Sequence, residues 1–502
     1  MNKYIIILVS VLSLGLVSCD AWLNRQPDEP RTSENIFEKR TTTFQYLANV
    51  YTWINNETDP SGQNNIFTPS SDECSVSFGN RWFRLFNNGT WQVSSNPSSF
   101  LSKNYSLYWK GIREASYFME NVHRCPELSD QEVKEWVAEA RFLRAYYYFC
   151  LMRMWGPVPI LGESPVDYSS EEVRDIDRNT WDECVNWVCD QCDLAAEDLL
   201  LEQSSTWLGR ATKGAALALK SRVLLYSARP LFNGNPMYKG MKNFYGNDLF
   251  PQTEDAQKWL AAAEAAEAVI DLGVYQIVGE LWGKPYEAWR KVFLERWNAE
   301  LIFARQHNSY NWRVATTPEG VGGRAYGGVG VTQKLVDAFA LESGRYPITG
   351  YEADGSPIID AEAANQGYTE SGFASFKHPI LGATRSTYKM YIGREPRFYM
   401  SVFWSGLNWI GGENTINDIQ LYKGGNSYTG SSDNYTTTGY LPFKFTSTSF
   451  NTKSQSTTTW EPITWPLFRY AETILNYAEA IAHCVKAGVG KYTAQDALTA
   501  VN

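Results

Sequence analysis

The chain has 502 residues, of which 44% are hydrophobic, 20% charged and 15% aromatic, and its formal net charge is −10. This composition is typical of a globular protein with a sizeable core and excludes an intrinsically disordered chain. The acidic balance argues against nucleic acid as a partner, because contact with phosphates needs a basic surface. It also disfavours polyanionic ligands, although more weakly.

The N-terminus predicts export and lipid attachment. A lysine precedes an apolar run at 4–17, which is shorter than the ~20 residues of a membrane-spanning helix. The run ends in Leu-Val-Ser-Cys at 16–19, which resembles the lipobox of bacterial lipoproteins, where the signal is cut before a cysteine that is then acylated. The alternative is an ordinary signal that ends by chance beside a cysteine. We predict a signal peptide at 1–18, lipidation of Cys19 and a single domain over 19–502.

A helical pattern appears first at 41–55 and is interrupted at 56–101. The interruption is rich in Asn, Ser, Gly and Pro but also carries aromatic residues, as in SFGNRWFRLFNNGTW. Long irregular connections in compact domains are usually functional or disordered, and the aromatic content argues against disorder. We therefore expect a functional loop.

Helix is predicted again at 105–122 and from Ser129 onward. The second helix contains RFLRAYYYFCLMRMWGPVPI at 141–160. Its apolar residues form two adjacent stripes that together cover most of the circumference, so the three consecutive tyrosines are interpreted as core rather than as an aromatic binding box. Gly156 and Pro157 are expected to end the helix.

Three cysteines, Cys184, Cys189 and Cys192, have the C-x4-C-x2-C spacing of a plant-type iron–sulfur site. The segment 180–202, however, begins with the capping box Thr-Trp-Asp-Glu and places these cysteines on an apolar helical stripe. We interpret them as small core residues and keep the cluster as the weaker alternative.

Further helices are predicted at 212–228 and 255–271. Beyond residue 300 the long helical patterns give way to short apolar runs and glycine-rich segments. LIFARQ at 301–306 is typical of a short strand. The glycine-rich segment 320–330 is expected to be a loop, and 332–341 to be a helical piece.

The remaining sequence predicts loops and short strands over 342–465, because short apolar runs alternate there with Gly, Ser, Thr, Tyr and Asn. Helix is predicted once more from Pro466 to about Val485. The succession of moderate-length helices suggests a scaffold of paired helices, although no tetratricopeptide period of ~34 residues is visible.

Motifs of common catalytic chemistry are missing from the sequence. It has four histidines without H-E-x-x-H spacing, no G-x-S-x-G elbow and no G-x-G-x-x-G in the glycine-rich segment. These observations argue against a histidine-rich metal site, a hydrolase nucleophile and a dinucleotide site. A pair of glycosidase carboxylates stays possible, because 55 acidic residues are available.

Six segments in order resemble the SusD/RagB family of outer-membrane lipoproteins. They are CDAWLNRQP at 19–27, EARFLRAYYYFCLMRMWGPVPI at 139–160, TKGAALALKSRVLLYSA at 212–228, ELIFARQ at 300–306, VTQKLVDAFALESG at 331–344 and RYAETILNYAEA at 469–480. Members of the family usually continue past the point where this chain stops. DALTAVN at 496–502 looks like the start of a further helix, which leaves open that a C-terminal portion is missing.

The resemblance implies a mainly α fold of tetratricopeptide-like helix pairs with loop-rich insertions and short β-strands. It implies a lipid-anchored protein at the outer-membrane surface that binds oligosaccharide or, in some members, peptide. The implied partner is a SusC-like TonB-dependent transporter, which the protein covers as a lid. The resemblance implies neither catalysis nor an obligatory cofactor.

Aromatic side chains in loops are the candidate sugar-binding groups. An indole can cover the apolar face of a sugar ring, while Asn, Asp and Arg hold its hydroxyls. The resemblance places binding aromatics in the region between the first two helices and around a strand like ELIFARQ. The candidates are Asn80, Arg81 and Trp82, with Trp91 nearby; Trp282; and Tyr310 and Trp312. For each tryptophan the alternative is packing beneath a loop.

Other polar and aromatic residues are weaker candidates. Asp72 is a possible polar contact, Arg81 and Arg313 could instead pair with carboxylates, and Trp289 and Trp297 fall in a helix-like stretch that favours core. Our hypothesis is a lipoprotein that captures a glycan, more readily a neutral one, for delivery to a transporter. The alternatives are a peptide-binding lid of the same type and a lipid-anchored glycosidase.

Overall fold

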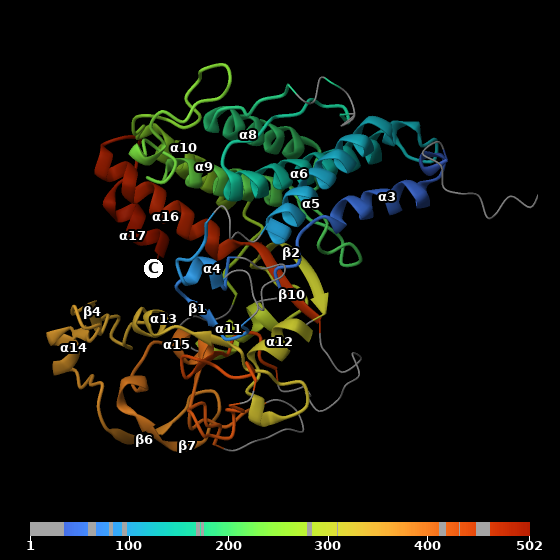
Figure 1. Cartoon of the computed structure of the whole chain (residues 1–502). Coiled ribbons are helices and arrows are strands. Elements are labelled where there is room, and N and C mark those ends of the chain that lie inside the picture. Colours follow the sequence, from blue (N-terminus) through green and yellow to red (C-terminus); the bar gives the residue numbers. More distant parts are fainter. Residues whose placement is uncertain are drawn as a thin grey trace, which may run out of the picture.

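The computed structural model describes residues 35–58, 67–79, 84–92, 98–166, 171, 175–278, 284–308, 310–410, 418–430, 432–447 and 462–501. Figure 1 shows two parts: a layer of long helices, and beneath it a region of short helices, strands and loops. We call the first part the helical layer. The second, built mainly of residues 310–447 together with the short strand at 74–76, is the lower lobe.

The helical layer contains segments from both ends of the chain. Its helices are α3 (Arg40–Thr52), α5 (Ser98–Asn121), α6 (Asp130–Trp155), α8 (Trp181–Asp198), α9 (Lys213–Ala228), α10 (Gln257–Ile270), α16 (Tyr470–Ala487) and α17 (Ala494–Val501). Successive members pack on one another from α5 to α17. This arrangement is the predicted mainly α scaffold of helix pairs, completed by the last helices of the chain.

Local sequence signals fix where the helices begin. Ser129 and Thr180 each accept a hydrogen bond from the backbone N–H three residues later, and the glutamate there bonds back, so both form complete capping boxes. Thr212 caps α9 in the simpler way, through its side chain alone. The predicted starts of these three helices are therefore confirmed.

Helix α6 lies in the middle of the layer and is buried over most of its length, as its two apolar stripes predict. Tyr146, Tyr147 and Tyr148 are at most 3% exposed. The hydroxyl of Tyr147 donates to the carbonyl of Val50 at 2.6 Å, so the triple tyrosine is core, as predicted. Gly156, with φ of 73°, ends the helix.

The cysteines are also core. Cys184, Cys189 and Cys192 lie on α8, are buried, and are free thiols. Burial raises the pKa of the Cys184 and Cys189 thiols to about 12. A protonated thiol is a poor metal ligand, and the interpretation as core residues is confirmed.

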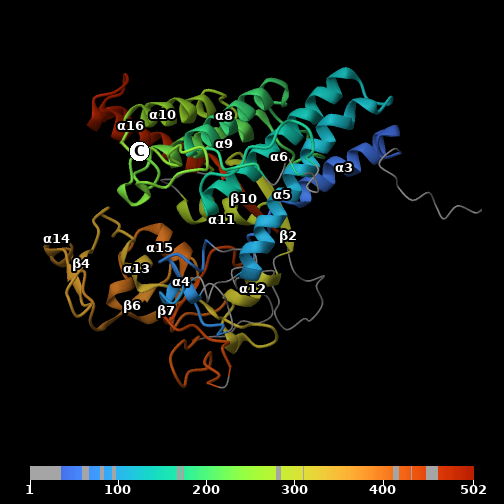
Figure 2. The ribbon, with the colours of Figure 1, turned by 45° about the horizontal axis from the view of Figure 1, so that its top comes forward.

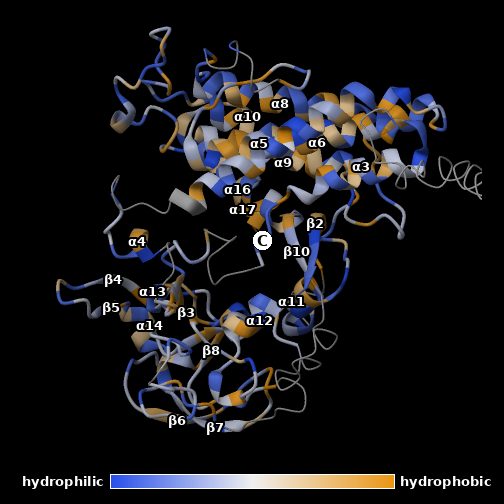
Figure 3. Ribbon diagram, turned by 45° about the vertical axis from the view of Figure 1, so that its right-hand side comes forward, coloured by the Kyte–Doolittle hydropathy of each residue, from blue (hydrophilic) through white to orange (hydrophobic). Residues whose placement is uncertain are grey.

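Strands β2 (Leu301–Asn308) and β10 (Pro462–Arg469) form an antiparallel pair with Trp465 opposite Arg305. Figure 3 shows this pair running from the helical layer toward α11 and α12. On the layer side, Phe303 of β2 packs edge-on against Phe142 of α6 with 5.1 Å between the ring centroids. Figure 2 shows the start of α5 reaching down toward the same junction.

The lower lobe is assembled from short elements around a second core of aromatic and aliphatic side chains. Its helices, with α11 at the junction, are α4 (Arg84–Asn87), α11 (Pro285–Leu294), α12 (Tyr310–Thr316), α13 (Gln333–Asp337), α14 (Ala361–Asn365) and α15 (Pro396–Ser401). Its strands form the antiparallel pairs β1 (Cys74–Val76) with β3 (Val329–Val331), β4 (Ile348–Tyr351) with β5 (Pro357–Ile359), β6 (Phe373–Lys377) with β7 (Thr384–Tyr388), and β8 (Val402–Trp404) with β9 (Tyr440–Pro442).

Several predicted boundaries are wrong. Residues 466–469 are the end of β10 rather than the start of a helix, because they pair with β2, and α16 begins only at Tyr470. The glycine-rich segment ends in strand β3, which pairs with β1. The helical piece at 332–341 stops at Asp337, since Leu341 forms a bridge with Arg394. Among the described residues, no helix is both long and apolar enough to cross a membrane.

Candidate ligand-binding site

The small sheet of β1 and β3 brings the described flanks of two of the predicted binding regions together. Cys74 lies opposite Val331, so the region that leads to residues 80–82 is fixed beside the chain that follows α12. Ala315 of α12 packs in one cluster with Cys74 and Val76. The flanks of the first and third candidate regions therefore share one face of the lower lobe.

Tyr310 stands at the start of α12, which the sequence analysis expected to be a loop. The backbone N–H of Tyr310 donates to the side-chain oxygen of Asn308 at 2.8 Å, which begins the helix. Its hydroxyl accepts a hydrogen bond from Arg324 at 2.6 Å, and that guanidinium also lies 5.5 Å from the ring centroid. Arg324 is not among the predicted site residues, and its two contacts position the ring of Tyr310.

Trp312 is a buried residue of the junction and presents no open ring face to solvent. It is 6% exposed, and its indole N–H donates to the carbonyl of Lys444 at 3.3 Å. The rings of Phe445 and Trp465 lie 5.4 Å from it, centroid to centroid. The alternative foreseen for this tryptophan, packing beneath neighbouring chain, is the arrangement in the structure. Arg313, the next residue, is 3% exposed.

Asp72 is exposed and paired. Its carboxylate contacts the ammonium group of Lys334, and this hydrogen bond lowers the pKa of Asp72. The pair lies at the edge of the β1–β3 sheet, where the hydroxyl of Thr332 also donates to the Asp72 carbonyl at 2.5 Å. Lys334 contacts one carboxylate oxygen, Oδ2, so the exposed side chain of Asp72 can still accept a ligand hydroxyl.

An exposed pair of rings lies on the same chain segment as the first candidate region. After α4 the chain turns at Gly89, where φ is 64° and where the backbone N–H groups of Gly89 and Thr90 donate back to the carbonyls of Phe86 and Leu85. This turn stacks Trp91 on Phe86, with 5.9 Å between centroids and an interplanar angle of 17°. Both rings are solvent-exposed, at 46% and 38%. The Asn-Asn-Gly sequence between them is the turn signal that could have predicted the pair.

A cavity of about 600 Å³ opens at the junction of the lobe with β10. Trp312, Lys444 and Phe293 are among its lining residues. The ammonium nitrogen of Lys444 lies 4.7 Å from the centroid of the Phe293 ring. Burial, together with the nearby Arg469, lowers the pKa of Lys444 to about 8. Lys444 gives no sequence signal, because its role comes from packing alone.

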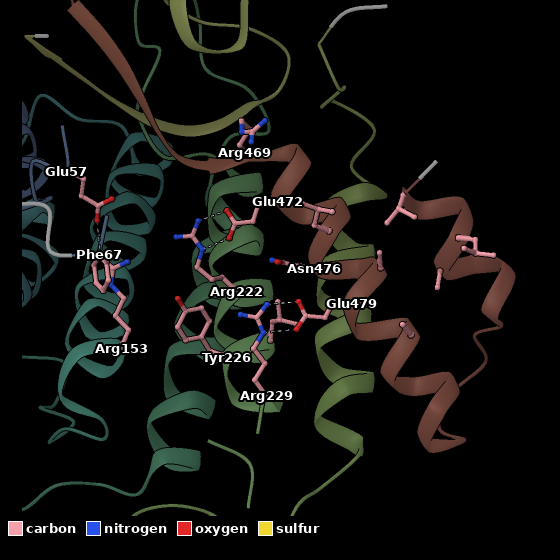
Figure 4. A pocket seen from close by; sticks show the side chains of 17 residues that line it. Glu57, Phe67, Arg153, Arg222, Tyr226, Arg229, Arg469, Glu472, Asn476 and Glu479 are labelled. Carbon is pink, nitrogen blue, oxygen red and sulfur yellow. Dashed lines mark hydrogen bonds and ion pairs between the residues drawn. The ribbon is translucent and has the colours of Figure 1, made fainter. Parts of the chain in front are cut away.

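A larger cavity of about 980 Å³ lies next to it along α9 and α16. Figure 4 shows two Arg–Glu ion pairs in its lining, Arg222–Glu472 and Arg229–Glu479, with Asn476 between them. Arg222 binds both carboxylate oxygens of Glu472, at 2.6 and 2.5 Å, and Arg229 holds Glu479 in the same way. The two cavities share lining residues, among them Arg222 and Glu472. Arg222 and Arg229 are thus each neutralised by a glutamate of α16, and the pairs join α9 to α16.

Five predicted site residues lie outside the described part of the chain. They are Asn80, Arg81, Trp82, Trp282 and the lipidation residue Cys19. Within the described residues, no group of three or more His, Cys, Asp or Glu side chains is arranged to hold a metal ion. The described side chains around β1 and β3 thus offer aromatic rings and hydrogen-bonding groups, which suit reversible binding of a polar ligand.

Two family models match most of this chain between them. The model described as the SusD family matches residues 299–502, and that described as "Starch-binding associating with outer membrane" matches residues 21–225. The chain belongs to the SusD/RagB family. The mainly α fold that this family implied is the fold described above.

Individual relatives of this SusD-like chain are distant. The SusD-like protein P25 of Formosa agariphila is 21% identical over 224 residues, which cover 43% of this chain and 42% of the relative. The chain thus matches less than half of that relative's length.

Solved structures share the fold over a longer stretch. A SusD-like protein of Bacteroides fragilis superposes with a TM-score of 0.68 at 24% identity, covering 93% of this chain and 78% of its own. A structure named "Laminarin binding SusD-like protein" has a TM-score of 0.52 at 18% identity and covers 93% of this chain and 84% of its own. At these identities the likeness is one of fold.

Proposed function

We propose that this SusD-like protein is a cell-surface, oligosaccharide-binding lipoprotein without catalytic activity. In this proposal it captures a glycan and delivers it to a SusC-like TonB-dependent transporter, which it covers as a lid. Family membership supports the proposal, since one matching model is described as starch-binding and associated with the outer membrane, and one structural neighbour is named for laminarin binding. Acylation of Cys19 would hold the protein at the outer membrane.

The observation that carries the binding proposal is the β1–β3 pairing, which joins the flanks of two candidate regions on one face. On that face we assign sugar stacking to Trp82, and we propose that Trp282 provides a second platform. Asn80 and Arg81 would bind ring hydroxyls. Tyr310, held by Arg324, would border the ligand, while the buried Trp312 supports the wall behind it.

The test is binding by the purified protein to an array of oligosaccharides, followed by calorimetry on the best ligand. Because a stacked indole contributes a large part of sugar affinity, Trp82→Ala and Trp282→Ala should each weaken binding about tenfold or more. Tyr346→Ala is the matched control, since Tyr346 is 58% exposed but lies beside β4, away from the β1–β3 sheet. Unchanged affinity in both tryptophan variants would refute the site assignment.

The same purified protein can be used to distinguish the alternative functions. Release of reducing ends during prolonged incubation with a bound polysaccharide would identify a glycosidase and refute the non-catalytic assignment. Tight binding of peptides together with an empty glycan array would identify a peptide-binding lid. Binding of glycan without turnover is the expected result.

A further inference from the structure

A second concave site lies on the helical layer, away from the β1–β3 face. It is an open pocket of about 490 Å³ between the segment 175–179, which precedes α8, and the turn 243–247, which lies between α9 and α10. In Figure 1 the long loop between α9 and α10 projects on the side of the layer opposite the lower lobe. None of these residues belongs to the site proposed above.

The turn that forms one wall is rigidly built. The backbone N–H of Asn243 donates to the carbonyl of Asn247 at 3.0 Å, and the N–H of Asn247 donates to the Asn243 side-chain oxygen at 3.0 Å. Gly246 adopts the left-handed φ of 84° that the reversal needs. Lys242 and Asp248 clamp its base with an ion pair of 2.8 Å.

The two walls are also tied to each other. The carboxylate of Asp177 accepts the backbone N–H of Phe244 across the pocket and that of Arg178 at 2.7 Å. The side-chain amide of Asn243 donates to the carbonyl of Arg178 at 3.2 Å. The pocket is therefore preformed, which lowers the entropic cost of binding.

The pocket formed by residues 175–179 and 243–247 presents one aromatic ring and several polar side chains to solvent. Tyr245 lines the pocket and is 76% exposed. Within the described part of the chain, the side chains of Asp175, Arg178, Tyr245 and Asn247 have no hydrogen-bonding partner in the protein. An exposed ring beside free donors and acceptors matches the apolar face and hydroxyl rim of a sugar.

The charges of the lining narrow the ligand class. Asp175, Asp177 and Glu183 supply three carboxylates to the lining, and Arg178 supplies its single guanidinium. A net negative lining repels uronic acids and sulfated sugars but leaves the hydroxyls of a neutral sugar free to bind carboxylates. Peptide or protein docking would use the apolar side chains beside the pocket instead, above all Phe244, which is 96% exposed.

We infer that this pocket is a second carbohydrate-binding site, for one or two residues of a neutral glycan stacked on Tyr245. The inference shares only the class of ligand with the proposed function. Two sites on separate faces would let one protein hold a long polysaccharide at two points, which raises its apparent affinity for polymer over that for short oligosaccharide.

The experiment uses the same array of neutral oligosaccharides, read with the wild-type protein and with a Trp82→Ala/Trp282→Ala variant that lacks the proposed loop site. In that variant we expect a residual, weaker binding that Tyr245→Ala or Asn247→Ala reduces by about tenfold, as loss of one ring or amide contact predicts. Phe244→Ala is the control, because its ring is exposed next to Tyr245 but does not line the pocket, and binding should persist.

The outcomes are distinct from failure of the proposed function. Binding by the wild type that is abolished in the double tryptophan variant and unaffected by Tyr245→Ala would overturn this inference alone. An array on which the wild type binds nothing would overturn both. Sensitivity of a protein interaction to Phe244→Ala, without any effect of Tyr245→Ala on glycan binding, would reassign the turn to protein docking and overturn the carbohydrate site.

Discussion

His378 is a buried residue of the lower lobe that the fold keeps neutral. It is 2% exposed, and its Nδ1 accepts the backbone N–H groups of Ile380 and Leu381, both at 3.2 Å. Tyr399 and Trp404 pack against the ring, at 5.5 and 5.1 Å between centroids. Burial lowers the pKa of His378 to about 4. A proton on Nδ1 would break both backbone bonds, so the imidazole and the turn after β6 depend on each other.

This environment predicts acid sensitivity. The folded pKa of about 4 is below the usual value of 6.5, so the unfolded chain binds more protons and the free energy of unfolding falls as pH drops from 6.5 to 4. His307, also with a pKa near 4, contributes in the same window. His378→Gln should therefore show a shallower pH dependence than wild type, by at most ~1.4 kcal/mol per pH unit.

Urea titrations at several pH values measure that slope. His123→Gln, a change at an exposed histidine, is the control and should follow the wild-type curve. Parallel curves for wild type and His378→Gln would show that His378 is not the acid-sensitive group.

At the scale of elements, the close packing of α5 on α6 depends on one glycine. A Cβ at Gly111 would lie 2.7 Å from the ring of Tyr147 and 3.0 Å from the Cβ of Trp53. Tyr147 cannot move aside, because it is fully buried and its hydroxyl is bonded to the backbone of α3. Gly111 thus sets the distance between three helices of the layer.

Gly111→Ala should destabilise the fold by ~1–3 kcal/mol, the usual cost of overpacking a core. The direction of the change in the free energy of unfolding is informative. Alanine is the better helix former by ~1 kcal/mol and would stabilise a helix with no neighbour at this position. Gly162→Ala is the matched control, since a Cβ there meets nothing within 4 Å. Equal midpoints of urea unfolding for the two variants would contradict this role of Gly111.

At the scale of the whole molecule, the net charge of −10 sets what the protein can attract. This charge disfavours long-range attraction of an anionic polymer, so we expect affinity to come mainly from short-range contacts with rings and hydroxyls. Two ion pairs, Arg222–Glu472 and Arg229–Glu479, join α9 to α16.

The proposed binding of a neutral glycan should therefore be nearly independent of ionic strength. We expect the affinity measured by calorimetry to change by less than about twofold between roughly 0.05 and 0.5 M salt. A sulfated or uronic-acid oligosaccharide of the same length serves as the comparison and should bind more weakly at low salt. A steep loss of affinity with added salt would instead indicate a charged ligand.

The helical layer could be predicted from sequence because its signals are local. The capping boxes at Ser129 and Thr180 and the apolar stripes of α6 need no knowledge of the rest of the chain. Strand β10 could not be predicted in full, because Pro466 and the residues after it suit a helix start and are held extended only by pairing with β2.

For the site, the sequence could indicate which regions of the chain to consider, but not which of their tryptophan side chains are exposed. The described flanks of the candidate regions around residue 80 and Tyr310 lie side by side, since β1 pairs with β3. Whether a tryptophan there is open or enclosed depends on its partners. Trp312 is enclosed by Phe445 and Trp465, whereas Trp91, as far as the described residues go, stacks on the local ring of Phe86 and is exposed.

The pairing of β1 with β3 also constrains how the protein is made. A chain synthesised from its N-terminus completes β1 early, yet the partner strand Val329–Val331 is produced only after most of the helical layer. Until then Cys74 and Val76 have no sheet to join, and their pairing is a contact of high sequence separation, the kind that slows folding. The β1–β3 face therefore cannot form until residues 329–331 are available, however early β1 is made.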